Sequence, residues 1–230
     1  MNVEHSSNSH WIPLADLMTG LMMVFMLLTA AFMLRVEQTT TLVVKEYEET
    51  KADMLRALQQ EFEKDLKQWN AELLGDMTIR FKDPTVLFAT GSAELKPQFR
   101  QVLKEFFPRY VNLLTSEKYR DAVKEVRIEG HTSTAWATST DAQSAYFHNM
   151  ELSQARTRSA LEFLLTLPPV ANERDWLIQH VTANGLSSSR PLSKNDKSFA
   201  AQQVNQRVEF RIVTNASDRM DQIARELSAR

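Results

Sequence analysis

An acidic residue near the N-terminus lies at the start of a long apolar run. Asp16 is followed by eighteen consecutive residues without a formal charge, Leu17 to Leu34. A carboxylate at the centre of a membrane helix costs roughly 2.5 to 3.5 kcal/mol, so it requires a partner, a water-filled cavity or a proton. On a helix, Thr19 and Gly20 share the face of Asp16 at the third and fourth following positions. This carboxyl, hydroxyl and small residue form the first candidate site, and its chemistry would be to carry an ion.

The stretch that holds Asp16 is long enough to cross a membrane. Residues 11–34 would form a helix about 36 Å long, whereas the hydrocarbon core of a bilayer is about 30 Å thick. Trp11 suits the membrane interface, and Pro13 suits the first turn of a helix. One alternative is that Asp16 only marks the helix N-terminus, where the helix dipole favours a negative charge. A signal peptide fits less well, because no Lys or Arg precedes the run and the run exceeds the usual length.

The residues after the apolar run predict an amphipathic helical segment. Residues 35–76 contain no Pro, and no Gly before Gly75, which we expect to end the helix. The apolar side chains recur mostly every three or four positions and would form one stripe: Val44, Tyr47, Leu55, Leu58, Phe62, Leu66, Trp69 and Leu73. Such a stripe is stranded in water unless it packs on something, so we expect a coiled-coil linker in a homodimer. The alternative is that the stripe folds back on the chain's own globular domain.

From residue 77 the hydrophobic pattern becomes mixed. Alternating apolar residues predict strands, and apolar residues at helical spacing predict two helices. The expected strands cover residues 78–82, 86–88, 123–131, 177–185 and 205–214, and the expected helices cover residues 96–114 and 150–167. This order, βαβαββ when the two short strands at 78–82 and 86–88 are counted together, predicts an α+β domain over residues 77–214, in which helices cover one sheet.

The remaining segments and the composition limit the possible functions. Residues 1–10 form a polar tail, residues 191–203 a polar loop and residues 215–230 a short amphipathic C-terminal helix. The net charge of −2 argues against direct nucleic-acid binding. No cysteine is present, so the chain has neither disulfides nor thiolate metal ligands. The mean hydropathy is −0.35 despite the apolar run, so most of the chain suits water.

The apolar run resembles the membrane helix of the MotB family. The resemblance is carried by Trp11, by Ala15-Asp16-Leu17-Met18-Thr19, and by the Met-rich apolar residues that follow up to Phe25. It implies that Asp16 carries a translocated ion, H⁺ or Na⁺, and that the chain needs no bound cofactor. It also implies a single-pass protein of the cell inner membrane, with a cytoplasmic N-terminus and a periplasmic C-terminal domain.

Residues 77–214 resemble the OmpA-like peptidoglycan-binding domain. The matching motifs are Leu87-Phe88-Ala89-Thr90-Gly91-Ser92-Ala93-Glu94-Leu95-Lys96-Pro97, Ile128-Glu129-Gly130-His131-Thr132, Asn149-Met150-Glu151-Leu152-Ser153-Gln154-Ala155-Arg156 and Asn205-Gln206-Arg207-Val208-Glu209-Phe210. The resemblance implies that the ligand is the diaminopimelate-bearing peptide stem of the cell wall. It assigns Asn149, Leu152 and Arg156 to the binding helix, where an arginine can hold a ligand carboxylate with two N–H groups. From the residues alone, Arg156 would be a surface arginine paired with Glu151 or Glu162.

One position departs from the OmpA-like pattern. Ser133 stands where that family usually has an aspartate after His-Thr. A serine hydroxyl can accept a hydrogen bond from a ligand ammonium but offers it no charge. Asp141, in the loop from residue 133 to residue 148, could take the place of that aspartate. In the same loop we expect Trp136 to anchor the loop, and its packing on a glycan is the alternative.

No set of residues predicts an enzyme. The sequence has no Ser-His-Asp order, no metal-binding triad and no Gly-rich phosphate loop. His131 is expected to be a hydrogen-bonding residue at a strand end and not a catalytic base.

Together these features predict a stator-type subunit with one membrane helix, a helical stalk and a wall anchor. The resemblance implies a MotA-like membrane subunit around a homodimer, with peptidoglycan as the second partner. Two uses fit: the flagellar stator subunit, and the ZorB-like component of the Zorya anti-phage defence system, whose partner would be ZorA-like. The short, non-basic N-terminal tail and the long helical segment after the span favour the defence component. A peptidoglycan-binding tether without ion transport is the alternative of another class.

Overall fold

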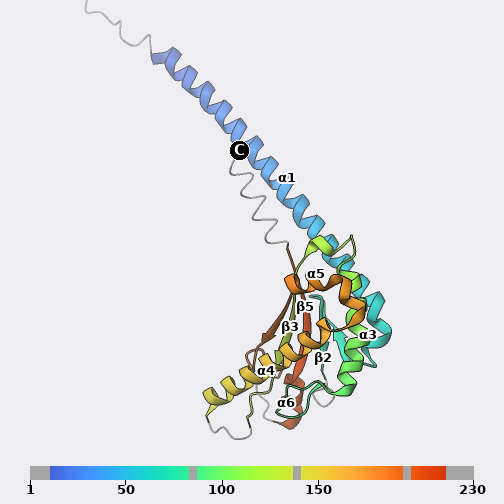
Figure 1. Cartoon of the computed structure of the whole chain (residues 1–230). Coiled ribbons are helices and arrows are strands. Elements are labelled where there is room, and N and C mark those ends of the chain that lie inside the picture. The colour runs from blue at the N-terminus through green and yellow to red at the C-terminus, as the bar shows by residue number, and fades with distance from the viewer. Residues whose placement is uncertain (1–10, 83–86, 137–140, 194–197, 216–230) are drawn as a thin grey trace, which may run out of the picture. The chain divides into compact units, whose positions relative to one another are not determined.

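The chain divides into two units, which we describe separately. The computed structural model describes residues 11–82, 87–136, 141–193 and 198–215 (Figure 1). One unit ends at Glu48 and the other begins at Glu49. The predicted tail at residues 1–10, and all but the first residue of the predicted C-terminal helix at residues 215–230, lie outside the described residues.

The described part of the first unit belongs to helix α1, Trp11–Leu66, which continues without a break beyond Glu48. The apolar run and the first part of the helical segment predicted after it thus belong to one helix. Within the described residues, α1 contains the one segment long and apolar enough to cross a membrane, Pro13–Gln38. Its 26 residues reach about 39 Å, more than the thickness of a hydrocarbon core. Its apolar side chains are not buried within the chain, so lipid or another protein must cover them.

The last turns of α1 belong to the core of the second unit. Met54, Leu58 and Phe62 have no exposed surface. The ring of Phe62 lies 5.3 Å from the ring of Phe106 in helix α3, Pro97–Leu114. The prediction that this part of the apolar stripe packs on a second copy of the chain is therefore wrong. It folds back on the chain's own domain, because the aromatic side chains of α3 offer it an apolar surface.

Polar contacts fix the same turns of α1 against the domain. Arg109 of α3 donates hydrogen bonds to Glu61 Oε1 and to Asp65 Oδ2, each over 2.7 Å. The hydroxyl of Tyr119 donates to Asp53 Oδ2 over 2.8 Å. The residues between Asp53 and Asp65 thus form part of the globular unit and not of a free stalk.

The sequence predicts that this helix ends at Gly75, but α1 ends at Leu66. Asn70 has a left-handed backbone conformation with φ of 50°, a common way for a helix to end. Its carbonyl accepts a hydrogen bond from the N–H of Lys82 over 3.2 Å. Strand β1, Ala71–Leu73, follows directly, so this stretch is the edge of the sheet and not the end of a helix.

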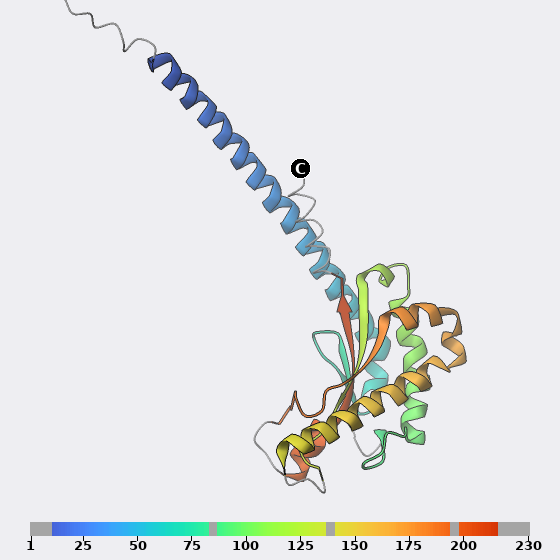
Figure 2. The same ribbon diagram turned by 60° about the vertical axis from the view of Figure 1, so that its left-hand side comes forward.

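Five strands form one sheet in the order β1-β2-β5-β3-β4 (Figures 1 and 2). Strands β3 and β4 are parallel, and the other neighbouring pairs are antiparallel. Besides β1, the strands are β2, Thr78–Phe81; β3, Val123–His131; β4, Val181–Gly185; and β5, Arg207–Thr214. The mixture of helices with one sheet confirms the predicted α+β class.

Helix α4, Ala142–Leu165, begins well before its predicted start at residue 150. The reason is a cap, because Asp141 Oδ2 accepts a hydrogen bond from the backbone N–H of Ser144 over 2.8 Å. Shorter helices complete the described part: η1, Arg120–Ala122; η2, Pro168–Glu173; α5, Arg174–His180; and α6, Phe199–Asn205.

Three short segments differ from their predicted conformation. Residues from Leu177 to His180 are helical in α5, so the predicted strand at 177–185 shrinks to β4. Helix α6 occupies part of the predicted polar loop at 191–203. Phe88, predicted within a strand, makes only an isolated bridge with Leu95. Short apolar runs of this kind do not distinguish strand from helix by periodicity alone.

Side chains of the sheet alternate between two faces. One face carries the buried apolar residues Ile79, Phe81, Val126, Ile128, Val208 and Phe210, which join α3 and the last turns of α1 in the core. The other face carries Arg80, Glu129, His131, Arg207 and Glu209. Helix α4 approaches the sheet closely at Gly185, where an added Cβ would collide with the backbone nitrogen of Gln154.

Candidate functional site

A cavity of about 190 Å³ lies where α4 meets the loops around β3 and β5. Its lining consists of Thr90, Gly91, Thr132, Ser133, Ala135, Trp136, Asn149, Leu152, Arg156 and Gln206. The structure thus brings together the four residues that the sequence assigns to the wall site: Ser133, Asn149, Leu152 and Arg156. Thr90, Gly91, Thr132 and Gln206 also line the cavity, and each lies within a motif of the OmpA-like pattern, but the sequence alone assigns them no role.

One face of α4 supplies the wall of the cavity. Asn149, Leu152 and Arg156 follow one another at spacings of three and four residues, so they project from the same side of the helix. Ser153, on the same side, accepts a hydrogen bond through its hydroxyl oxygen from the backbone N–H of Ser187 over 3.0 Å. This contact and the close approach at Gly185 fix how far each side chain reaches into the cavity.

The guanidinium of Arg156 is enclosed. The residue is 8% exposed, and its Cζ lies 4.9 Å from the centre of the Phe88 ring. Its Nε–H donates to the carbonyl of Ser92 over 2.9 Å, and Nη2 donates to the carbonyl of Ala89 over 3.2 Å. Burial lowers the pKa of Arg156 to about 10, so the side chain stays positively charged at neutral pH. Among the described residues no carboxylate pairs with it.

A tight turn presents the two carbonyls that Arg156 contacts. The backbone N–H of Ser92 donates to the carbonyl of Ala89 over 3.0 Å, which closes the turn. Gly91 lies third in this turn with φ of 69°, a conformation that favours glycine. The motif Ala89-Thr90-Gly91-Ser92 therefore forms the turn whose carbonyls accept the hydrogen bonds of Arg156.

The loop after β3 forms the opposite wall. The side-chain amide of Asn149 donates to the carbonyl of Ala135 over 3.2 Å, which ties the loop to α4. Trp136 stacks on His148 of α4, with ring centres 5.1 Å apart, which fits its expected role as a loop anchor. The hydroxyl of Thr132 is buried and makes no hydrogen bond with the residues that the structure describes.

Two alternatives for charged residues near the cavity are contradicted. Asp141, considered as a replacement for the missing aspartate, caps α4 and does not line the cavity. Arg156 does not pair with Glu162, which accepts instead from Nε of Arg158 over 2.8 Å. Arg156 is therefore a buried arginine and not an exposed one.

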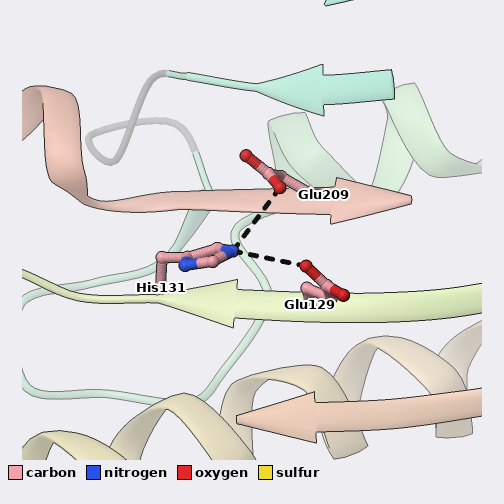
Figure 3. A group of neighbouring side chains, drawn as sticks. All are labelled: Glu129, His131 and Glu209. Atoms are coloured by element: carbon pink, nitrogen blue, oxygen red, sulfur yellow. Dashed lines mark ion pairs between the residues drawn. The ribbon is translucent and has the colours of Figure 1, made fainter. Parts of the chain in front are cut away.

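A second group of charged residues lies on the opposite face of the sheet. Figure 3 shows His131 pointing its Nε2 toward Glu209, 3.5 Å away, and Glu129, 3.8 Å away. The three side chains are almost fully buried. Four guanidinium groups lie within 3.8 Å of the two carboxylates: those of Arg80, Arg190, Arg207 and Arg211. The carboxylates and the histidine could offer ligand atoms to a metal ion, but the surrounding guanidinium groups oppose a further cation.

This charge network stabilises the ionised form of the buried carboxylate of Glu209. Burial raises the pKa of Glu209, but the nearby ring of His131 and the hydrogen bond and charge of Arg207 outweigh burial and lower it overall. Burial lowers the pKa of His131, and the attraction of Glu209 only partly opposes this. His131 is thus a neutral residue of a structural network at neutral pH.

The predicted ion-handling residues lie together on α1. Asp16, Thr19 and Gly20 are exposed in the described chain. The hydroxyl of Thr19 donates to the carbonyl of Ala15 over 2.8 Å, so only its oxygen remains to accept a hydrogen bond or bind an ion. An added Cβ at Gly20 would meet nothing within 4 Å, so another helix could approach this face closely.

Comparison with known proteins identifies a full-length relative. The chain is 42% identical to the Zorya protein ZorB of Escherichia coli over 224 residues, which cover 95% of this chain and 94% of that protein. No family model matches the chain. Similar solved structures include the cell wall anchor of the T6SS from Pseudomonas aeruginosa, with 22% identity, TM-score 0.49, and coverage of 68% of this chain and 96% of that one. Another is a MotB-like protein from Desulfovibrio vulgaris, with 22% identity, TM-score 0.49, and coverage of 76% and 98%.

Proposed function

The chain belongs to the ZorB family of Zorya proteins, and on this premise we propose that it is the wall-anchored subunit of an inner-membrane, ion-driven motor complex in the Zorya anti-phage defence system. Membership of this family favours that role over the flagellar stator. The domain that follows Glu49 holds the cell wall, and Asp16 carries the ion. The role is one of transport and anchoring and not of enzymatic catalysis.

The observation that carries this proposal is the buried, unpaired charge of Arg156. Removing a cation from water without an anion to pair with it is costly. A guanidinium kept in this state at a cavity suits a ligand that supplies the anion, and its planar fork matches a carboxylate with two hydrogen bonds. The ligand that we propose is a carboxylate of the peptide stem of peptidoglycan, bound between Arg156, Asn149 and the loop that holds Ser133.

The exposed apolar run of α1 supports the ion-carrying half of the proposal. Asp16 lies within the segment Pro13–Gln38. A bilayer around that segment would leave the carboxyl without water or a polar partner, unless another subunit provides one. We propose that a MotA-like subunit, here ZorA-like, surrounds a homodimer of this chain. The buried turns of α1 from Met54 onward no longer support the dimer, so that part of the proposal depends on the membrane segment alone.

Ion movement and wall attachment together give the proposed motor its direction. The N-terminus is cytoplasmic and the domain is periplasmic, so an ion that reaches Asp16 crosses the membrane potential. One elementary charge moved across 100 mV releases about 2.3 kcal/mol, enough to bias a conformational step. Occupancy of Asp16 by H⁺ or Na⁺ changes its charge and hence its packing with the surrounding subunit, and the anchored dimer stays still while that subunit moves.

Replacing the carboxyl of Asp16 tests the ion-carrying role. Asp16→Asn should abolish protection against phage infection, while the protein still inserts into the membrane and copurifies with its partner. Glu37→Gln, an exposed carboxylate near the end of the same segment, is the matched control and should keep protection. Full protection by Asp16→Asn would leave the chain as a wall-binding tether.

Replacing Arg156 tests the wall-binding role. Arg156→Ala should reduce retention of the detergent-solubilised full chain on purified peptidoglycan sacculi by at least about tenfold, the effect of losing about 1.4 kcal/mol of binding free energy. Arg158→Ala is the matched control, because Arg158 lies on the exposed side of α4 and pairs with Glu162. Equal retention of the two variants and the unaltered chain would remove the ligand assignment.

A further inference from the structure

Ten of the described residues line the cavity around Arg156, and among these ten only Arg156 carries a formal charge. The guanidinium supplies that charge, and the other lining residues offer hydroxyl, amide, apolar or aromatic groups. A carboxylate bound here therefore meets an opposite charge. An ammonium group bound here meets a like charge and neutral dipoles, which disfavour it.

Two acidic residues close to the cavity in the sequence, Asp141 and Glu129, are engaged elsewhere. The carboxylate of Asp141 accepts hydrogen bonds from the backbone and the hydroxyl of Ser144 at the start of α4. Glu129 points to the opposite face of the sheet, where it lies 3.5 Å from Arg190 and 3.6 Å from Arg211. Neither side chain lines the cavity, so neither offers a charge to a bound ammonium.

The hydrogen-bonding groups of the cavity suit a carboxylate. A guanidinium has five N–H donors, and within the described residues those of Arg156 make two hydrogen bonds, from Nε and from Nη2. Nη1 donates no hydrogen bond to any described residue, so the edge formed by Nη1 and Nη2 can hold both oxygens of a carboxylate. The buried hydroxyl of Thr132 likewise has no hydrogen-bond partner in the described part of the chain and can make a third contact with the ligand.

Building on the proposed wall-binding function, we propose that this cavity recognises the peptide stem by a carboxylate alone and makes no use of the free amino group of the diamino acid. Ser133 is the residue that determines this specificity. Its side chain lies in the cavity and is buried, with 7% of the residue exposed, at a position from which a carboxylate would attract an ammonium group. The cavity therefore accepts stems whose amino groups are free, blocked or absent.

Chemically modified sacculi test this proposal. The detergent-solubilised full chain is sedimented with unmodified sacculi, with sacculi whose amino groups are acetylated, and with sacculi whose carboxyl groups are amidated. Retention on acetylated sacculi should equal retention on unmodified ones within about twofold, and amidation should reduce it by at least about tenfold. A tenfold loss on acetylation, or undiminished retention after amidation, would overturn the proposal. Absence of retention on unmodified sacculi would instead refute the wall-binding function on which it rests.

A substitution at residue 133 sharpens the test. Ser133→Asp places a carboxylate in the cavity and should make retention depend on the amino group, with retention on acetylated sacculi about tenfold below that on unmodified sacculi. Thr134→Asp adds the same charge at the exposed neighbouring residue, outside the lining, and should bind both forms equally. If Ser133→Asp binds both forms equally as well, Ser133 is not the specificity-determining residue.

Discussion

The cavity and the charge network on the opposite face of the sheet each enclose an arginine, but the two arginines have different partners. Arg207 donates to Glu209 over 2.7 Å and to backbone carbonyls of Asn205 and Arg190. Arg156 donates only to backbone carbonyls. Burial lowers the pKa of both side chains, and only at Arg207 does a carboxylate oppose that effect. Burial alone therefore does not reveal what a charged residue does, whereas the presence or absence of an opposite charge does.

The largest effect should come from removing the paired arginine. Arg207→Ala should lower the free energy of unfolding by about 3 to 5 kcal/mol, because it takes one partner from a buried ion pair. Chemical denaturation of the full chain in detergent, followed by the fluorescence of the buried Trp69 and Trp176, measures this change. A loss below about 1 kcal/mol would mean that Arg80 alone satisfies Glu209, and the contrast between the two arginines would disappear.

Lowering the pH should reduce the stabilisation that the charge network around Glu209 and His131 gives to the fold. The pKa of His131 is lowered from 6.5 in the folded chain, so the unfolded chain binds more protons just below pH 6.5. The free energy of unfolding should therefore fall as the pH drops below 6.5, by at most about 1.4 kcal/mol per pH unit for one such group. The lowered pKa of Glu209 has the same sign, and its stabilisation is lost below about 4.5.

Denaturation curves between pH 8 and pH 5 measure this acid effect, and His131→Gln serves as the control variant. This variant removes the titrating ring but keeps a polar side chain. It should flatten the dependence of the unfolding free energy on pH in that range. An unchanged dependence in His131→Gln would assign the acid effect to other groups.

The smallest effect on stability should come from the unpaired arginine. Arg156→Met fills a similar volume with an apolar side chain and removes a desolvated charge, so the free energy of unfolding should change by less than about 1 kcal/mol. The same denaturation experiment measures it beside Arg207→Ala. A loss of 3 kcal/mol or more would show that Arg156 serves the fold as Arg207 does.

The sequence predicts the site better than it predicts the helix that precedes the domain. The resemblance to the OmpA-like pattern assigns Asn149, Leu152 and Arg156 to one helix, and α4 carries all three on one face, because their spacing of three and four residues is a local property of the chain. The stripe in residues 35–76 has mostly helical spacing on both sides of Met54, so periodicity cannot indicate whether a second copy or the chain's own domain covers it. The aromatic residues of α3 decide this for the turns from Met54 onward.

Neither the end of α1 nor the burial of Arg156 can be predicted from the sequence, because both depend on signals that the residue types give only weakly. Asn70, with its left-handed backbone, lies between the turn after α1 and strand β1, and it is a weaker sequence signal for a break than Gly75. Arg156 and Arg158 lie two positions apart and are of the same type, so residue type does not indicate which one is buried. The packing of α4 on the sheet decides it, because the turn at residues 89–92 encloses one side of the helix.

By itself, the sequence determines that this chain has an apolar helix with a carboxyl near its start, and an α+β domain that contains the ordered motifs of the OmpA-like pattern. These features depend on composition, spacing and order, which are written along the chain. Only the tertiary structure decides that Arg207 is neutralised by Glu209 and that Arg156 is not paired with an acid. The reason is that the register of strands β2, β3 and β5 brings charges more than a hundred residues apart into one network. The described lining of the cavity, in contrast, comes from three loops and one helix and includes no acidic residue.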